Sequence, residues 1–220
     1  MTRQDFINNY GDYIISVTNG TGIFPETLVA QAIIESSDNS GNVGASTLAS
    51  KYNNYFGIKA DSRWTGKSIN MKTGEYTGTP DATTINAYFR AYDSPQDSIQ
   101  DYVNFLKKNS RYASAGVFNA SSPQEQGQLL QKAGYATGAG YGNLVGQIAS
   151  EVHGALSAIK AGAGSIVGTQ NVQEFEDITK KGITTITQSP LLLVAGVGMI
   201  GLALFMTMEF FRTNDMATAA

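Results

Sequence analysis

Two glutamates about forty positions apart have the residue type and spacing for shared acid–base chemistry. Glu35 comes at the end of an apolar run that begins at Leu28, and Glu75 lies in a stretch where apolar and polar residues alternate. A carboxyl at the edge of an apolar surface keeps its proton near neutral pH, because burial disfavours its charged form. Such a group can act as a general acid while a second carboxylate acts as base, nucleophile or stabiliser of positive charge. Glu35 and Glu75 are therefore the first candidates for a reactive pair.

The composition excludes several other kinds of site. The chain of 220 residues has no cysteine and one histidine, His153, and its net charge is −3. The lack of cysteine rules out disulfides, thiolate nucleophiles and thiolate metal sites. A zinc site would have no second imidazole, and a Ser-His-Asp triad would have to use His153, which we expect on a helix as a surface or core residue. The charge balance gives no basic patch for nucleic acid. We expect no metal, no cofactor and no nucleic-acid partner.

The element that must position Glu35 is a short, mostly buried helix over residues 25–36. Pro25 suits the first helical turn, and a cluster of Ser, Asp, Asn and Gly residues follows the apolar run. Leu28, Ala32 and Glu35 share one face of such a helix because they are spaced by four and then three positions. This face places the carboxylate at the boundary of the core. The alternative is a helix-end carboxylate that is exposed to water.

Glu75 is expected near the tip of a small, irregular β-lobe. Apolar and polar residues alternate over 68–76 and again over 83–92, and Gly78 and Pro80 lie between the two stretches. Helical spacing and start signals predict the remaining elements as helices. These helices cover about 6–17, 44–50, 94–109, 123–132 and 141–160. The predicted fold class is α+β, mainly α, with a helical domain and a small β-lobe.

The chain is expected to consist of one domain followed by different material. We assign residues 1–160 to the domain, 161–189 to a linker, 190–212 to a transmembrane helix and 213–220 to a short polar tail. The span rests on residues 191–208, which carry no charge over 18 positions, about the minimum for crossing a bilayer. The alternative is a buried helix or a hydrophobic tail used in assembly. The polar start of the chain does not have the pattern of a signal peptide.

Seven short motifs occur in an order that is typical of one enzyme family. They are Gln31-Ala32-Ile33-Ile34-Glu35-Ser36, Gly44-x-Ser46-x-Leu48-Ala49, Asn53-Asn54-x-Phe56-Gly57-Ile58-Lys59, Thr73-x-Glu75, Phe89-Arg90-x-Tyr92, Arg111-Tyr112 and Ala133-Gly134-Tyr135-Ala136-Thr137. In this respect residues 3–158 closely resemble the bacterial and phage β-N-acetylglucosaminidases of glycoside hydrolase family 73. Each motif alone is weak, whereas seven in order are specific.

The resemblance implies a lysozyme-like fold and hydrolysis of the N-acetylglucosaminyl-β-1,4-N-acetylmuramic acid bond of peptidoglycan glycan strands. It implies that Glu35 is the general acid and that Glu75 is the second acid on the β-lobe, whose role varies within the family. It also implies that Tyr135 supports the active site. Two regions depart from the family pattern. The loop at 37–44 is longer and lacks the usual Gly-Trp-Gly, and 138–139 replace the usual Asp-Pro.

Four further residues are expected to line the substrate cleft. They are Asn54, Phe56, Tyr112 and Tyr141. Flat aromatic rings stack on sugar faces, which is the reason for choosing the three aromatic residues. The alternative is that each of them belongs to the core.

Two other functions remain open at this point. One is a lytic transglycosylase on the same fold, which needs only one acid and forms anhydro products. Against it, Asn54-x-Phe56-Gly57-Ile58-Lys59 stands where that family would have Gly-Leu-Met-Gln. The other is a non-catalytic, membrane-anchored protein that binds glycan or serves a structural role. Lipid contact through residues 191–208 would place the domain in a cell envelope or in a phage virion that contains a membrane. There the protein could open the cell wall at entry or exit.

Overall fold

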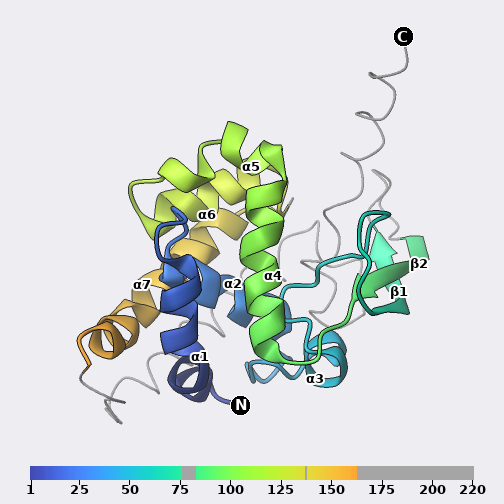
Figure 1. Cartoon of the computed structure of the whole chain (residues 1–220), viewed down its shortest axis with the longest axis horizontal. Coiled ribbons are helices and arrows are strands. Elements are labelled where there is room, and N and C mark those ends of the chain that lie inside the picture. The colour runs from blue at the N-terminus through green and yellow to red at the C-terminus, as the bar shows by residue number, and fades with distance from the viewer. Residues whose placement is uncertain (76–82, 137, 163–220) are drawn as a thin grey trace.

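The computed structural model describes residues 1–75, 83–136 and 138–162, which form a helical body with a two-stranded hairpin at one side (Figure 1). The helices and strands in chain order are α1 (Arg3–Thr18), α2 (Pro25–Ser36), α3 (Thr47–Tyr52), β1 (Ser68–Glu75), β2 (Thr83–Arg90), α4 (Pro95–Lys108), α5 (Ser110–Ser114), the 3-10 helix η1 (Val117–Asn119), α6 (Pro123–Lys132) and α7 (Tyr141–Lys160). This is the mainly helical α+β architecture that the sequence predicts.

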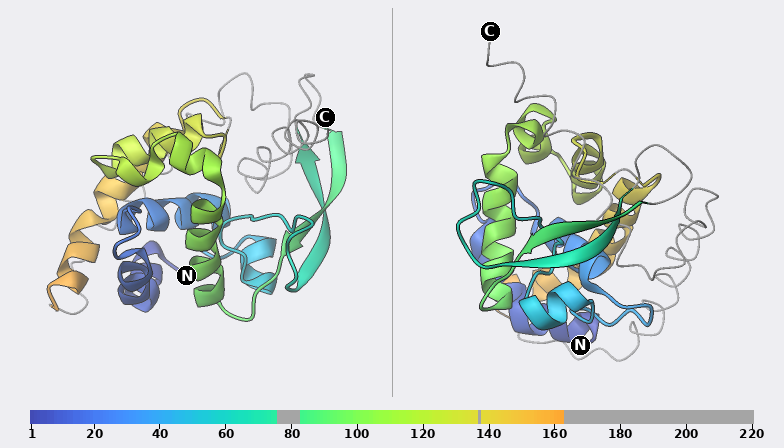
Figure 2. Two further views of the ribbon diagram at one scale, coloured as in Figure 1. Left: turned by 45° about the horizontal axis from the view of Figure 1, so that its top comes forward. Right: turned by 90° about the vertical axis from the view of Figure 1, so that its right-hand side faces the viewer.

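Helix α2 forms the centre of the helical body and packs against α1, α6 and α7 (Figures 1 and 2). Its residues from Glu26 to Ile33 are all buried. Pro25 occupies the first helical position, where its missing N–H costs nothing, and the amide of Ser37 closes the last turn on the carbonyl of Ile33. The predicted helix over 25–36 is confirmed at both ends.

Helices α6 and α7 approach each other closely because glycines meet at their contact. A Cβ added at Gly142 would lie 2.7 Å from the Cα of Gln128, and one added at Gly127 would lie 2.8 Å from the carbonyl oxygen of Gly142. Both distances are too short for a real Cβ, so only glycine permits this packing. The contact fixes the start of α7, and therefore Tyr141, against the rest of the body.

The hairpin has one face packed on α3. Strands β1 and β2 pair antiparallel from Ser68 opposite Arg90 to Glu75 opposite Thr83. Ala87 and Phe89 on β2 form a small second core with Leu48 of α3. The predicted β-lobe is confirmed, with each strand ending one or two residues earlier than expected. The short helices α5 and η1 were not predicted.

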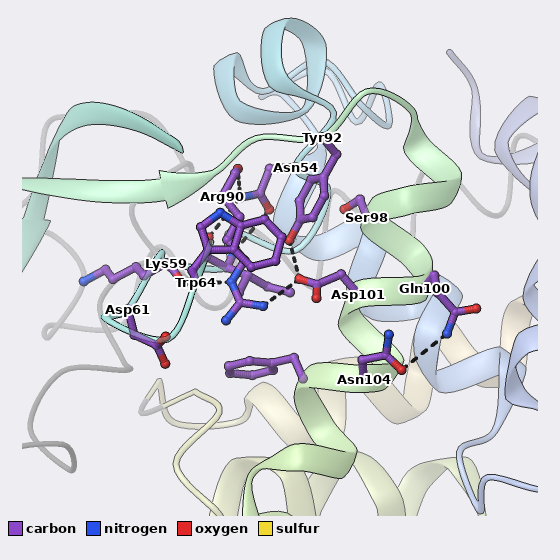
Figure 3. A network of polar contacts seen from close by, with 12 residues as sticks. Asn54, Lys59, Asp61, Trp64, Arg90, Tyr92, Ser98, Gln100, Asp101 and Asn104 are labelled. Atoms are coloured by element: carbon purple, nitrogen blue, oxygen red, sulfur yellow. Dashed lines mark hydrogen bonds and ion pairs between the residues drawn. The ribbon is translucent and has the colours of Figure 1, made fainter. Parts of the chain in front are cut away.

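Arg90, the last residue of β2, ties the hairpin to α4 (Figure 3). Its Nη1 donates a 2.7 Å hydrogen bond to Asp101 Oδ2 on α4, and its Nε donates a 3.2 Å bond to the carbonyl of Lys59. The Trp64 ring centroid lies 4.4 Å from the guanidinium carbon. The Tyr92 hydroxyl donates to the same Asp101 oxygen at 2.7 Å. These contacts are largely buried, so they set the position of the hairpin relative to the helical body.

The predicted linker, transmembrane helix and polar tail lie outside the described residues. Among the helices that the structure does describe, none has the length and apolar character needed to cross a bilayer.

Candidate active site

Glu35 lies in the last turn of α2, at the boundary between core and solvent. Its Oε1 accepts a 2.9 Å hydrogen bond from the hydroxyl of Tyr141, the first residue of α7. Its Oε2 is buried and has no hydrogen-bond partner among the described residues. The residue as a whole is only partly buried although Oε2 itself is covered, so Glu35 lies at the rim of the core. The expected partial burial is confirmed, and the alternative of a fully solvated carboxylate is wrong.

Burial raises the pKa of Glu35 to about 8. The cause is desolvation, because the ionised carboxylate loses water without gaining a cationic partner. The hydrogen bond from Tyr141 acts in the opposite direction and lowers the pKa, since it stabilises the charged form. Desolvation is the larger of the two effects. At pH 7 the carboxyl therefore holds its proton, as a general acid requires.

A chain of hydrogen bonds extends from Glu35 into the core. The side-chain amide of Gln31 on α2 donates a 3.0 Å bond to the Tyr141 hydroxyl. The hydroxyl of Tyr102 on α4 in turn donates to Gln31 Oε1. Gln31 and Tyr102 are fully buried, and Tyr141 is 3% exposed. Three helices thus contribute one side chain each to a dry network that ends on the carboxyl of Glu35.

Tyr135 lies beside this network, on the loop between α6 and α7. Its ring centroid is 6.1 Å from the rings of Tyr102 and Tyr141, and its hydroxyl donates a 3.3 Å bond to the carbonyl of Phe56. Burial, and next the charge of Glu35, raises the pKa of Tyr135 well above the usual phenol value. The hydroxyl therefore stays protonated beside the carboxyl. Its predicted supporting role is consistent with this position and stays a prediction.

The four residues predicted to line the cleft are buried. Asn54 is 1% exposed, and its amide donates to the carbonyls of Ile58 and Arg90 at 3.0 and 2.8 Å. Phe56 is 3% exposed and stacks on Tyr102 with ring centroids 4.2 Å apart. Tyr112 is fully buried, and Tyr141 holds Glu35. In the described structure these side chains make internal contacts, so their role in touching sugar remains a prediction.

Glu75 is the last residue of β1, where its backbone pairs with that of Thr83. This confirms its place at the far end of the hairpin. The side chain of Glu75 lies outside the described part of the chain. Its assignment as the second acid therefore rests on the sequence.

The loop at 37–44, which departs from the family pattern, is held by its own hydrogen bonds. Asp38 Oδ1 accepts from the amides of Ser40 and Asn42, both at 2.9 Å. The amide of Gly44 donates a 3.0 Å bond to the hydroxyl of Ser36, next to Glu35. The loop carboxylate is thus engaged by its own backbone. Across the described ranges, no three His, Asp or Glu side chains gather as a metal site would require.

A contact between His153 and Glu26 and a cavity lie at the opposite end of α2, away from Glu35. His153 Nδ1 lies 2.8 Å from Glu26 Oε1 in the first turn of α2, and the His153 side chain is 67% exposed. A cavity of about 480 Å³, lined in part by Phe24 and Phe118, lies at the same end. Both are separated from Glu35 by the length of α2. They belong to a different region of the molecule.

Gln31 and Tyr102 are the site residues that sequence reasoning did not single out. Gln31 is a polar residue in an apolar run, four positions before Glu35 and therefore on its face of the helix. That position was a usable signal. Tyr102 shares a face with apolar residues in the helix predicted over 94–109, so nothing local distinguished it from a core residue.

Comparison with known proteins places the chain in a family. A family model described as "Glucosaminidase: Mannosyl-glycoprotein endo-beta-N-acetylglucosaminidase" matches residues 11–153. The peptidoglycan hydrolase FlgJ of Pseudomonas aeruginosa is 39% identical over 141 residues, which are 64% of this chain and 34% of that protein. The chain spans between a third and a half of the length of the curated relatives it matches.

Solved structures of two catalytic domains have a fold similar to that of this chain. The catalytic domain of the autolysin Auto from Listeria monocytogenes matches with a TM-score of 0.58 and 30% identity, over 69% of this chain and 84% of that one. A truncated glycoside hydrolase domain of FlgJ from Salmonella typhimurium matches with a TM-score of 0.50 and 27% identity, over 69% of this chain and 98% of that one.

Proposed function

Because the chain belongs to the glucosaminidase family, we propose that it is a glycoside hydrolase that cleaves peptidoglycan at the N-acetylglucosaminyl-β-1,4-N-acetylmuramic acid bond. The observation that carries this proposal is Glu35, a rim carboxyl whose pKa burial raises to about 8. A group that stays protonated at pH 7 can donate its proton to the oxygen of a glycosidic bond. The resemblance to the family supports the same role, because it implies that this glutamate is the general acid.

The proposed mechanism uses Glu35 as the proton donor and Glu75 as the second carboxylate. Glu35 protonates the glycosidic oxygen as the bond to the anomeric carbon breaks, and the electron pair of that bond moves to the departing oxygen. Glu75 either stabilises the oxocarbenium-like transition state or activates the attacking water. A separation beyond about 6 Å between two such carboxyls favours water attack or help from the N-acetyl group over a covalent intermediate.

The test is to identify the glycan ends that the full chain releases from purified peptidoglycan, using mass spectrometry. Reducing N-acetylglucosamine ends would support the proposal. Reducing N-acetylmuramic acid ends would move the cut to the other glycosidic bond, and anhydro ends would point to a lytic transglycosylase. Binding without new ends would overturn the enzyme assignment. Glu75→Gln should reduce the rate severely if Glu75 is the second carboxylate, and an unchanged rate would remove it from the mechanism.

We also propose that residues 191–208 attach the protein to a lipid bilayer, in a cell envelope or a phage virion that contains a membrane. The support is the uncharged run of 18 residues between Pro190 and Glu209. Flotation of the full chain with liposomes tests this. The wild type should float and Ile200→Arg should stay with the soluble fraction, because a charge at the centre of a span disfavours insertion. Equal behaviour of the two proteins would contradict the anchor.

A further inference from the structure

We propose that Gln31 is a positioning residue for the general acid: held by Tyr102, it keeps the Tyr141 hydroxyl aimed as a hydrogen-bond donor at Glu35. We call the chain of hydrogen bonds from Tyr102 through Gln31 and Tyr141 to Glu35 the relay. Its effect on catalysis rests on the proposed function, whereas the hydrogen bonds themselves do not. Its four members come from α2, α4 and α7, so the device exists only in the folded chain.

The order of donors and acceptors in the relay sets its direction. Tyr102 donates to Gln31 Oε1, which leaves the Gln31 amide nitrogen to face Tyr141 as a donor. The Tyr141 oxygen accepts that bond at 3.0 Å, and its own proton is then directed to Glu35 Oε1 at 2.9 Å. If the Gln31 amide were reversed, its oxygen would compete with Glu35 for the Tyr141 proton. Tyr102 therefore selects the amide orientation that supports Glu35.

Burial keeps the relay in this protonation state. Gln31 and Tyr102 are fully buried and Tyr141 is 3% exposed, so water does not compete for their hydrogen bonds. Burial raises the pKa of Tyr102 and of Tyr141 well above the phenol value, so both hydroxyls remain donors. Among the residues that the structure describes, the ionisable groups whose pKa the charge of Glu35 raises are these two tyrosines and Tyr135.

The relay also distinguishes the two oxygens of Glu35. Oε1 accepts from Tyr141, so the proton of the neutral carboxyl resides on Oε2, which has no partner in the described part of the chain. When the carboxyl loses that proton, the Tyr141 donor stabilises the charge that remains. A relay of this direction therefore lowers the pKa of Glu35 from the still higher value that burial alone would give.

The test is a titration of the Glu35 carboxyl by NMR in the full chain labelled with ¹³C-glutamate, with Glu35→Gln used to assign its signal. Tyr141→Phe should raise the Glu35 pKa, because it removes the donor. Gln31→Met should raise it in the same direction by at least about half a unit, because the Tyr141 hydroxyl is no longer held. In the Tyr141→Phe background, Gln31→Met should have no further effect. This result is expected if Gln31 acts on Glu35 through Tyr141. If Gln31 only supported the structure, Gln31→Met would have the same effect in both backgrounds.

Gln126→Met is the matched control. Gln126 is a fully buried glutamine with three hydrogen bonds, to Gly22, Phe24 and Val117, at the other end of α2. Both Gln126→Met and Gln31→Met should lower the stability of the protein, because each removes buried hydrogen bonds. Gln126→Met should leave the pKa of Glu35 unchanged. If Gln31→Met does not fold, Tyr102→Phe tests the same relay, because it removes the contact that orients the Gln31 amide.

The outcomes separate the relay from the proposed function. An unchanged Glu35 pKa in folded Gln31→Met or Tyr102→Phe overturns the relay, and so do equal shifts in Gln31→Met and Gln126→Met. A shift of the Glu35 pKa in Gln31→Met that disappears in the Tyr141→Phe background upholds the relay. If the same chain releases no sugar ends from peptidoglycan, the relay stands and the proposed function is refuted. If the chain is active, Gln31→Met should lower kcat several-fold with KM nearly unchanged.

Discussion

The Tyr141 hydroxyl donates a 2.9 Å hydrogen bond to Glu35 across 106 positions of sequence. This contact joins the end of the central helix α2 to the start of α7, and both partners are held by buried neighbours. The pKa of Glu35 therefore depends on how α4 and α7 pack against α2.

The first prediction concerns the pH dependence of activity. A general acid works only while it holds its proton, and burial raises the pKa of Glu35 to about 8. We expect kcat/KM on peptidoglycan to fall tenfold per pH unit above about pH 8, since this parameter reports groups of the free enzyme. The measurement is a rate profile from pH 5 to 10. An alkaline limb near pH 5 would show that Glu35 is ionised in the resting enzyme.

The second prediction concerns stability. The folded pKa of Glu35, about 8, lies above the value of 4.5 expected in the unfolded chain. The folded state therefore binds this proton more strongly, and stability from this group is present below pH 4.5 and lost as pH rises to 8. Glu35→Gln removes this loss. We expect the variant to gain on the order of 2 to 4 kcal/mol in the free energy of unfolding at pH 8 relative to its difference at pH 4. Urea melts at the two pH values measure it, and a constant difference would contradict it.

Local signals were sufficient to predict the main elements of the fold. Pro25, Pro95 and Pro123 each begin a helix where the sequence predicted one, because proline suits the first turn. Helices α5 and η1 escaped prediction because five and three residues are too few for a period to emerge. The partial burial of Glu35 was also predictable, since the run before it is apolar.

The partners of Glu35 could not be predicted in the same way. Tyr141 was expected to touch sugar, and nothing in the sequence around Tyr102 distinguished it from a core residue. Their hydroxyls meet Glu35 and Gln31 through contacts across 106 and 71 positions, which depend on how α4 and α7 pack on α2. Periodicity specifies which face of a helix is buried. It does not specify which residue of another helix that face will meet.

The third prediction concerns the attachment of the hairpin. Arg90 and Asp101 are joined at 2.7 Å with side chains only 10% and 18% exposed. Asp101→Asn leaves a buried arginine without its countercharge, and we expect a loss of about 2 to 4 kcal/mol in unfolding free energy together with a lower kcat. The exposed pair of Lys67 and Asp93 at the same base is the control. Asp93→Asn should have no measurable effect on either quantity, because exposed ion pairs contribute little. Equal effects of the two variants would refute the anchoring role of Arg90.

The fourth prediction concerns the placement of α7. Gly142→Ala would put a Cβ 2.7 Å from the Cα of Gln128, so the helices must separate. We expect a loss of about 1 to 3 kcal/mol in unfolding free energy and a lower kcat, because Tyr141 moves with α7. Gly154 in the same helix has no atom within 4 Å of such a Cβ. Gly154→Ala should instead stabilise the protein by about 0.5 to 1 kcal/mol with kcat unchanged. Thermal melts and rate measurements on both variants test this prediction, and equal effects of the two substitutions would contradict it.

The measurement that tests the central claim most directly compares two conservative substitutions on α2. Glu35→Gln removes the proposed proton donor, and Glu26→Gln changes a buried glutamate, 8% exposed, at the opposite end of the same helix. We would follow the release of new glycan ends from purified peptidoglycan by the wild-type chain and both variants. Our account predicts wild-type release by Glu26→Gln and a loss of at least about a thousandfold in Glu35→Gln, near what removal of a general acid costs. Release by Glu35→Gln at the wild-type rate would contradict it.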